Sequence, residues 1–210
     1  MIKIEEERRF KETVQIINHE NVYKNFIEIG GTDASFKSFV EHDSWIIIDK
    51  YGDPDINVDL DGRKVNLPFD DDSIECFILT EVLEHLRMGT PLIKEIYRCL
   101  KKDGMLIISV PNAVSLGNRM KWFFGRIPFM AASSDCGHDL GGTGTFRNGY
   151  WEGAHVVDFN KKRLKLYIER CDFKLIKFYK SAVQIKNIPI PKFLTSITLG
   201  NFLIATFKKE

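Results

Sequence analysis

The sequence predicts an α/β fold built on a mostly parallel sheet, and two observations support this prediction. Short apolar runs with the length of strands alternate along the chain with segments of helical periodicity. These runs are continuously apolar, which is typical of strands that helices cover on both faces. The chain has 210 residues, of which 44% are hydrophobic and 28% charged, so we expect one globular domain over residues 1–210.

The predicted strands are apolar, and several of them end in a glycine or an acid. They cover residues 25–30, 45–49, 56–60, 74–80, 105–110, 173–179 and 201–207. A parallel sheet brings the carboxyl ends of its strands to one edge, so ligand-binding residues are expected there. The ends carry residues 30–35, Asp49, Asp59, 80–85 and 109–112.

The predicted helices are recognised by their periodicity and by capping residues. The first is an amphipathic helix within the N-terminal segment 1–22. Thr90 followed by Pro91 is a favourable helix start, and Asn160 is a favourable cap. The expected helices cover residues 4–17, 35–40, 81–86, 90–100 and 160–171.

Residues 113–158 lose the alternating pattern, and we expect them to form a substrate lid inserted after the fifth strand. Within this segment, residues 119–126 mix basic and aromatic side chains. We expect a helix here whose rings pack on the domain, and contact with a lipid surface is the alternative. Residues 137–153 are rich in glycine, asparagine and threonine and are expected to be loop.

Charge and cysteine content exclude several classes of protein. Lys and Arg number 30 against 29 Asp and Glu, and this balance disfavours a nucleic-acid partner. No apolar stretch is long enough to span a membrane, and residues 1–10 lack the apolar core of a signal peptide. The cysteines, which form no C-x-x-C pair, favour a reduced protein in the cytoplasm. They are Cys76, Cys99, Cys136 and Cys171.

A glycine turn follows the first predicted strand, and an acid ends the second. Gly30 and Gly31 allow close approach of the backbone to a ligand, and Asp49 lies nineteen positions after Gly30. An acid at about this spacing binds ribose hydroxyls in nucleotide-binding folds. A nucleoside-type ligand and a plain turn with an exposed acid are both compatible with this segment. The full dinucleotide fingerprint G-x-G-x-x-G is absent, because Thr32 and Ser35 stand in the places of its later glycines.

Five segments in order resemble the class I S-adenosylmethionine-dependent methyltransferases, in the small-substrate group similar to methyltransferase type 11. They are Glu28-Ile-Gly-Gly-Thr-Asp-Ala, Ile48-Asp49, Asn57-Val-Asp-Leu60 with Leu67-Pro-Phe-Asp-Asp-Asp-Ser-Ile-Glu75, Thr80-Glu-Val-Leu-Glu-His-Leu86, and Leu100-Lys-Lys-Asp-Gly-Met-Leu-Ile-Ile-Ser-Val-Pro-Asn112. The resemblance implies a Rossmann-like sheet of seven strands with helices on both faces and the last strand antiparallel. It also implies methyl transfer from S-adenosylmethionine to a small acceptor such as a sugar, a lipid or a metabolite.

The resemblance further implies a set of cofactor-binding residues. Glu28, Gly30 and Gly31 would hold the methionine end, and Asp49 would accept from the ribose hydroxyls. The adenine and the sulfonium would be contacted by residues of the third and fourth strands. These are Asp59 and Leu60 for the adenine, and Thr80, Glu81 and Val82 with His85 below them for the sulfonium side.

One departure from the family pattern supports a rival function. Thr32 and Ala34 stand where the family has its second and third glycines. A noncatalytic binding or scaffold protein with a degenerate cofactor site is therefore the first alternative. A nicotinamide-dependent oxidoreductase is the second, although no Tyr/Lys or His/Asp pair suited to hydride transfer is recognisable. The D/N-P-P-Y/F signature of nucleic-acid amino-methyltransferases is also absent after the fourth strand.

Histidines are the candidate acid–base groups. His138 and His155 flank the expected lid, and either is a candidate base or a solvated loop residue. For His85 the favoured interpretation is a buried helix histidine bonded to a nearby carboxylate such as Glu81 or Glu84, and a role in orienting substrate or accepting a proton is the alternative. The spacing of histidines and cysteines predicts no metal site.

Overall fold

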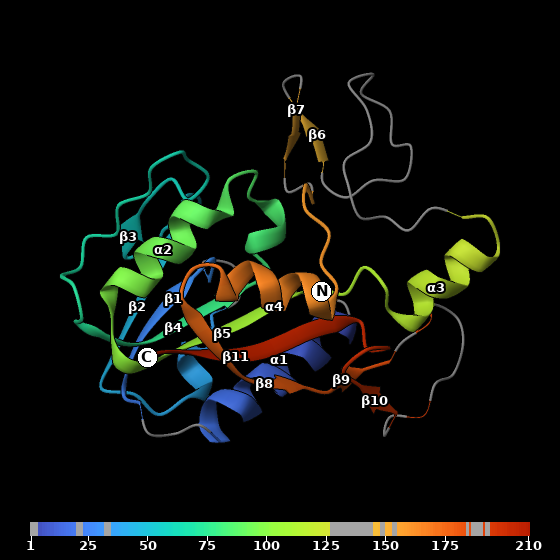
Figure 1. Ribbon diagram of the computed structural model, residues 1–210, viewed down its shortest axis with the longest axis horizontal. Coiled ribbons are helices and arrows are strands. Elements are labelled where there is room, and N and C mark those ends of the chain that lie inside the picture. The colour runs from blue at the N-terminus through green and yellow to red at the C-terminus, as the bar shows by residue number, and fades with distance from the viewer. Residues whose placement is uncertain are drawn as a thin grey trace.

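A seven-stranded sheet forms the centre of the computed structural model, which describes residues 4–19, 23–31, 35–126, 145–147, 150–152, 155–183, 185, 191 and 194–210. The strand order is β3-β2-β1-β4-β5-β11-β8 (Figure 1). The strands are β1 Asn25–Ile29, β2 Ser44–Asp49, β3 Ile56–Asn57, β4 Ile74–Thr80, β5 Leu100–Pro111, β8 Phe173–Tyr179 and β11 Phe202–Lys209. Within this sheet β11 alone runs in the opposite direction to the other strands, so the predicted fold class is confirmed.

Two apolar layers hold the sheet, one on each face. Successive side chains of a strand point to opposite faces, so Phe26 and Ile78 belong to one layer while Ile27 and Phe77 belong to the other. All four side chains are buried. The continuous apolar runs in the sequence therefore reflect strands that are covered on both sides.

The long helices lie on the two faces as the sequence predicts (Figure 1). Helices α2 (Gly89–Cys99) and α4 (Lys161–Glu169) cover one face, and α1 (Ile4–His19) covers the other. The predicted cap of α4 is confirmed, because the side chain of Asn160 accepts from the backbone N–H of Arg163 at 2.8 Å. Thr90 does not cap α2; its hydroxyl donates to the Tyr167 hydroxyl at 3.2 Å.

Two predicted helices are wrong in kind. Residues 35–40 contain only the 3₁₀ turn η1 (Lys37–Phe39), and residues 81–86 contain only the 3₁₀ turn η2 (Leu83–His85). The second departure has a local cause, since Glu81 has a φ of +57° and cannot start an α-helix there. The chain therefore makes a sharp corner directly after β4.

The expected lid over residues 113–158 is described only in part. Helix α3 (Leu116–Phe123) and the hairpin of β6 (Thr145–Arg147) and β7 (Tyr150–Glu152) belong to it. Residues 127–144, 148–149 and 153–154 lie outside the described part of the chain, so the lid itself stays a prediction. The short strands β9 (Ser181–Ala182) and β10 (Thr195–Ser196) pair separately.

The aromatic side chains of the segment 119–126 lie at the surface. Trp122, Phe123 and Phe124 are 60%, 80% and 66% exposed, so the prediction that these rings pack on the domain is wrong. Contact of this segment with a lipid surface stays a prediction. No helix within the described ranges is both long and apolar enough to cross a membrane.

Candidate functional site

A tight glycine turn follows β1 at the carboxyl edge of the sheet. Gly30 has a φ of +81°, and its N–H donates to the carbonyl of Ile48 at 2.9 Å. A Cβ at Gly30 would lie 2.2 Å from Val82 Cγ2, and a Cβ at Gly31 would lie 2.5 Å from Glu28 Cδ. Both positions therefore require glycine, one for its backbone angle and both for space.

Glu28 supports this turn from inside the protein. Its carboxylate is fully buried and accepts from Ser35 Oγ at 2.5 Å, from the Phe36 N–H at 3.2 Å and from Trp45 Nε1 at 2.8 Å. Burial raises the pKa of Glu28, and these hydrogen bonds oppose the rise. The contacts of Glu28 thus tie the turn to β2, and its predicted contact with a cofactor stays a prediction.

Asp49 lies beside the turn, at the end of β2. Its Oδ1 accepts from the backbone N–H groups of Lys50 and Tyr51 at 2.6 and 3.2 Å, and the residue is half-buried. Its carbonyl accepts from the Val58 N–H at 3.0 Å, which holds the end of β3 alongside. The structure therefore brings together the glycine turn and the acid that the sequence predicts as neighbours.

Asp59 and Leu60 follow β3 at the same edge but lie in different environments. Asp59 is exposed and pairs with Lys50 Nζ at 3.0 Å, which lowers the pKa of its carboxyl. Leu60 is 5% exposed and belongs to the core under α2. The predicted contacts of Asp59 and Leu60 with an adenine ring stay predictions.

The corner after β4 forms the next wall of the edge. Thr80 is buried, and Val82 packs against Gly30. The carboxylate of Glu81 accepts from Ser109 Oγ at 2.9 Å and lies 3.9 Å from Arg9 of α1. These contacts join the corner after β4 to β5 and to α1, which is distant from it in the sequence.

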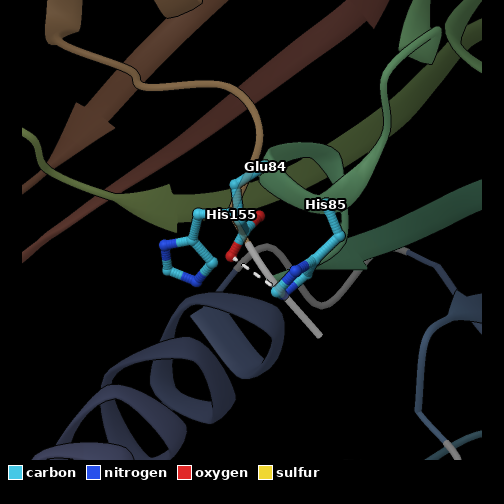
Figure 2. Close-up of side chains that lie close together, drawn as sticks. All are labelled: Glu84, His85 and His155. Atoms are coloured by element: carbon cyan, nitrogen blue, oxygen red, sulfur yellow. Dashed lines mark ion pairs between the residues drawn. The ribbon is translucent and has the colours of Figure 1, made fainter. Parts of the chain in front are cut away.

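Glu84, His85 and His155 form a compact group next to this corner (Figure 2). His85 Nε2 lies 3.9 Å from Glu84 Oε1, and the two imidazole rings meet edge to face with centroids 4.8 Å apart. His85 lies beside Glu84 as that interpretation expects, but its side chain is 32% exposed, so the prediction that it is buried is wrong. His155 is brought here because the N–H groups of Val156 and Val157 donate to the Glu84 carbonyl at 2.8 and 3.1 Å.

The ionisation of this group is set mainly by burial. Burial raises the pKa of Glu84 well above its usual value, and the nearby Glu81 adds to the rise. Burial lowers the pKa of His155 to about 4, and His85 contributes. His155 is therefore an uncharged ring at neutral pH and a weaker base than an ordinary histidine.

The predicted site residues thus lie along one edge of the sheet, with some exceptions. His138, Thr32 and Ala34 fall outside the described residues, so predictions for them stay as made. The sequence analysis missed Arg9 and Trp45. No local sequence pattern shows that Arg9 contacts Glu81 or that Trp45 contacts Glu28. Such contacts arise only from the packing of α1 and from the pairing of β1 with β2.

Comparisons with known proteins bear on the family and on the fold. The family described as methyltransferase domain matches residues 48–108. A solved S-adenosylmethionine-dependent methyltransferase from Thermotoga maritima, described as a possible histamine N-methyltransferase, has a TM-score of 0.63 at 16% identity, over 97% of this chain and 90% of that one. The N-methyltransferase NodS from Bradyrhizobium japonicum, solved with S-adenosyl-L-homocysteine, has a TM-score of 0.56 at 12% identity, over 98% and 88%.

A third similar structure is described as a cyclase, so the fold alone does not identify the reaction. The cyclase SpnF has a TM-score of 0.56 at 13% identity, over 96% of this chain and 81% of that one. No curated protein matches the chain. At such identities the likeness establishes the fold, and the reaction must be argued from the site.

Proposed function

We propose that the chain is a class I S-adenosylmethionine-dependent methyltransferase and that it transfers a methyl group from S-adenosylmethionine to a small-molecule acceptor. One observation carries the proposal. The Gly30 N–H donates to the carbonyl of Ile48, so the glycine turn lies directly beside Asp49. A close-approach turn next to a carboxylate suits a nucleoside that carries a charged amino-acid tail.

The same residues define the proposed cofactor site. Gly30 and Gly31 would receive the methionine end, Asp49 the ribose hydroxyls, and Asp59 with Leu60 the adenine. The sulfonium side would face the corner of Thr80, Glu81 and Val82, with His85 next to it. The tight space at both glycines, which a Cβ would fill, supports this assignment. When bound, S-adenosylmethionine supplies a methyl group that is already activated for displacement.

The chain's own contribution would be alignment and exclusion of water, because the donor needs no further activation. A hydroxyl acceptor would still need a base. His155, with its pKa lowered to about 4 by burial, is poorly matched to that task at neutral pH. His138 remains the other candidate. An amine or an activated carbon as acceptor would need no such group.

The acceptor class and the cellular location belong to the proposal as well. A sugar, a lipid or a metabolite is proposed as acceptor, and no nucleic-acid partner is invoked because the net charge is +1. Cys76, Cys99 and Cys171 are buried free thiols, which suits a reducing compartment such as the cytoplasm. Thr32 and Ala34, which replace two glycines of the family pattern, still support the noncatalytic alternative.

Ligand-induced thermal stabilisation separates the three functions. We expect about 1 mM S-adenosylmethionine or S-adenosylhomocysteine to raise the melting temperature of the full chain by several degrees, and NAD to leave it within about 1 °C. Transfer of radiolabelled methyl to members of a panel of sugars, lipids and amines would follow. No shift with either sulfur ligand would favour the scaffold alternative, and a shift with NAD alone would favour the oxidoreductase.

A further inference from the structure

We propose that Glu84, His85 and His155 bind one first-row divalent transition-metal ion, with Zn²⁺ as the reference ion, beside the corner that follows β4 (Figure 2). Two imidazole nitrogens and one carboxylate oxygen form the donor set. Imidazole donors favour zinc, iron and similar ions, whereas magnesium and calcium prefer oxygen donors alone. Metal binding is independent of the proposed methyl transfer.

The three side chains converge closely enough for one ion. One donor atom from each lies within 4.8 Å of the other two, and His85 Nε2 is 3.9 Å from Glu84 Oε1. Donors about 2.1 Å from a common ion lie about 3.4 Å apart in a tetrahedron and at most about 4.2 Å apart. A side-chain movement of about 1 Å therefore brings the widest pair into bonding range.

Glu84 gives an independent reason for a ligand at this place. The residue is 1% exposed, and neither of its carboxyl oxygens has a hydrogen-bond partner among the described residues. A buried carboxylate in this condition costs several kcal/mol unless a cation or a set of donors compensates it. A metal ion between Glu84 and the two rings would supply that compensation.

The backbone holds the donors in place before any ion arrives. The N–H groups of Val156 and Val157 both donate to the carbonyl of Glu84, which clips residue 155 against residue 84. The charges that face the cluster from neighbouring elements are Glu81 on the same corner and Arg9 on α1. Arg9 and Glu81 carry opposite charges, so their electrostatic effects on Glu84 oppose each other.

Three protein donors leave at least one coordination position open. The side chain of His85 is 32% exposed, so solvent reaches the cluster. The open position would take a water molecule or an oxygen or nitrogen atom of the methyl acceptor. This last role, unlike metal binding itself, rests on the proposed function.

Calorimetric titration of the tag-free, chelator-treated full chain with Zn²⁺ tests the proposal. We expect one equivalent to bind, with Mg²⁺ at least about tenfold weaker. Glu84→Gln and His155→Asn should each weaken Zn²⁺ binding by at least about tenfold, because the first removes the negative charge of the carboxylate donor and the second removes an imidazole donor. His19→Asn, at the exposed end of α1, is the matched control and should bind as the wild type does.

Circular dichroism and the absorption spectrum of bound Co²⁺ complete the test. A folded His155→Asn variant that loses the Co²⁺ ligand-field bands supports the site even if Glu84→Gln fails to fold. The proposal is overturned if less than about a tenth of an equivalent of Zn²⁺ binds at about 100 μM free ion. It is also overturned if His155→Asn binds Zn²⁺ as tightly as the wild type, because the ion then lies elsewhere.

Discussion

Gly30→Ala is expected to distort the glycine turn and to weaken the binding of S-adenosylhomocysteine at least about 100-fold. This loss corresponds to about 2.7 kcal/mol of binding free energy. The new Cβ would lie 2.2 Å from Val82 Cγ2, and the φ of +81° is strained for alanine. Either the turn or the corner after β4 must move. We expect the free energy of unfolding to fall by about 2–4 kcal/mol, measured by urea denaturation.

Two further variants separate the causes of this loss. Gly125→Ala has a similar φ of +68° with nothing within 4 Å of the new Cβ, so it should cost only about 1 kcal/mol. Val82→Ala removes the clashing methyl, so its combination with Gly30→Ala should be less destabilised than the sum of the single variants. Equal losses in Gly30→Ala and Gly125→Ala would contradict the close contact with Val82.

Glu28→Ala is the second large expected effect, with a loss of about 3–4 kcal/mol in the free energy of unfolding. The substitution leaves Trp45 Nε1 and the Phe36 N–H without their acceptor in a buried region, and it opens a cavity. Glu41→Ala is the control, because the side chain of Glu41 is 82% exposed, and it should change stability by less than about 0.5 kcal/mol. A Glu28→Ala protein within about 1 kcal/mol of the wild type would refute the supporting role of Glu28.

The pH dependence of stability gives a check on the same residue. Burial raises the folded-state pKa of Glu28 above that of the unfolded chain. Its contribution is therefore fully present below the unfolded value, near 4.5, and is lost as the pH rises through the raised folded value. In the wild type, the free energy of unfolding should therefore fall as the pH rises between the unfolded-state and folded-state pKa values of Glu28. We expect the Glu28→Gln variant to lack this fall, as measured by urea denaturation across that pH range.

Much of the fold was predictable because burial on both faces leaves a strong mark on the sequence. The runs that form β1 and β4 are apolar at consecutive positions, and Asn160 caps α4 by a purely local interaction. The helix expected over 81–86 was wrong because the backbone of Glu81 turns to a positive φ. At this corner the Glu81 N–H donates to the carbonyl of Ser109, which belongs to the neighbouring strand, and Ser109 Oγ donates to the Glu81 carboxylate.

Part of the candidate site could be predicted from the sequence, and part could not. Gly30 and Asp49 were predictable as neighbours, because their places at strand ends follow from the parallel pairing of β1 with β2. The group of Glu84, His85 and His155 was not, although two of its members are adjacent in the chain. His155 reaches the others through backbone hydrogen bonds between segments about 70 residues apart, and the sequence spacing predicts no such contact.

Calorimetric titration with S-adenosylhomocysteine, applied to the wild type, Asp49→Asn and Asp53→Asn, tests the central claim most directly. Asp53 is an exposed acid in the loop after β2, so its variant controls for lost charge. We expect the wild type and Asp53→Asn to bind alike, and Asp49→Asn to bind at least about tenfold more weakly, or about 1.4 kcal/mol. Binding by Asp49→Asn as tight as that of the wild type would contradict a nucleoside held at the end of β2.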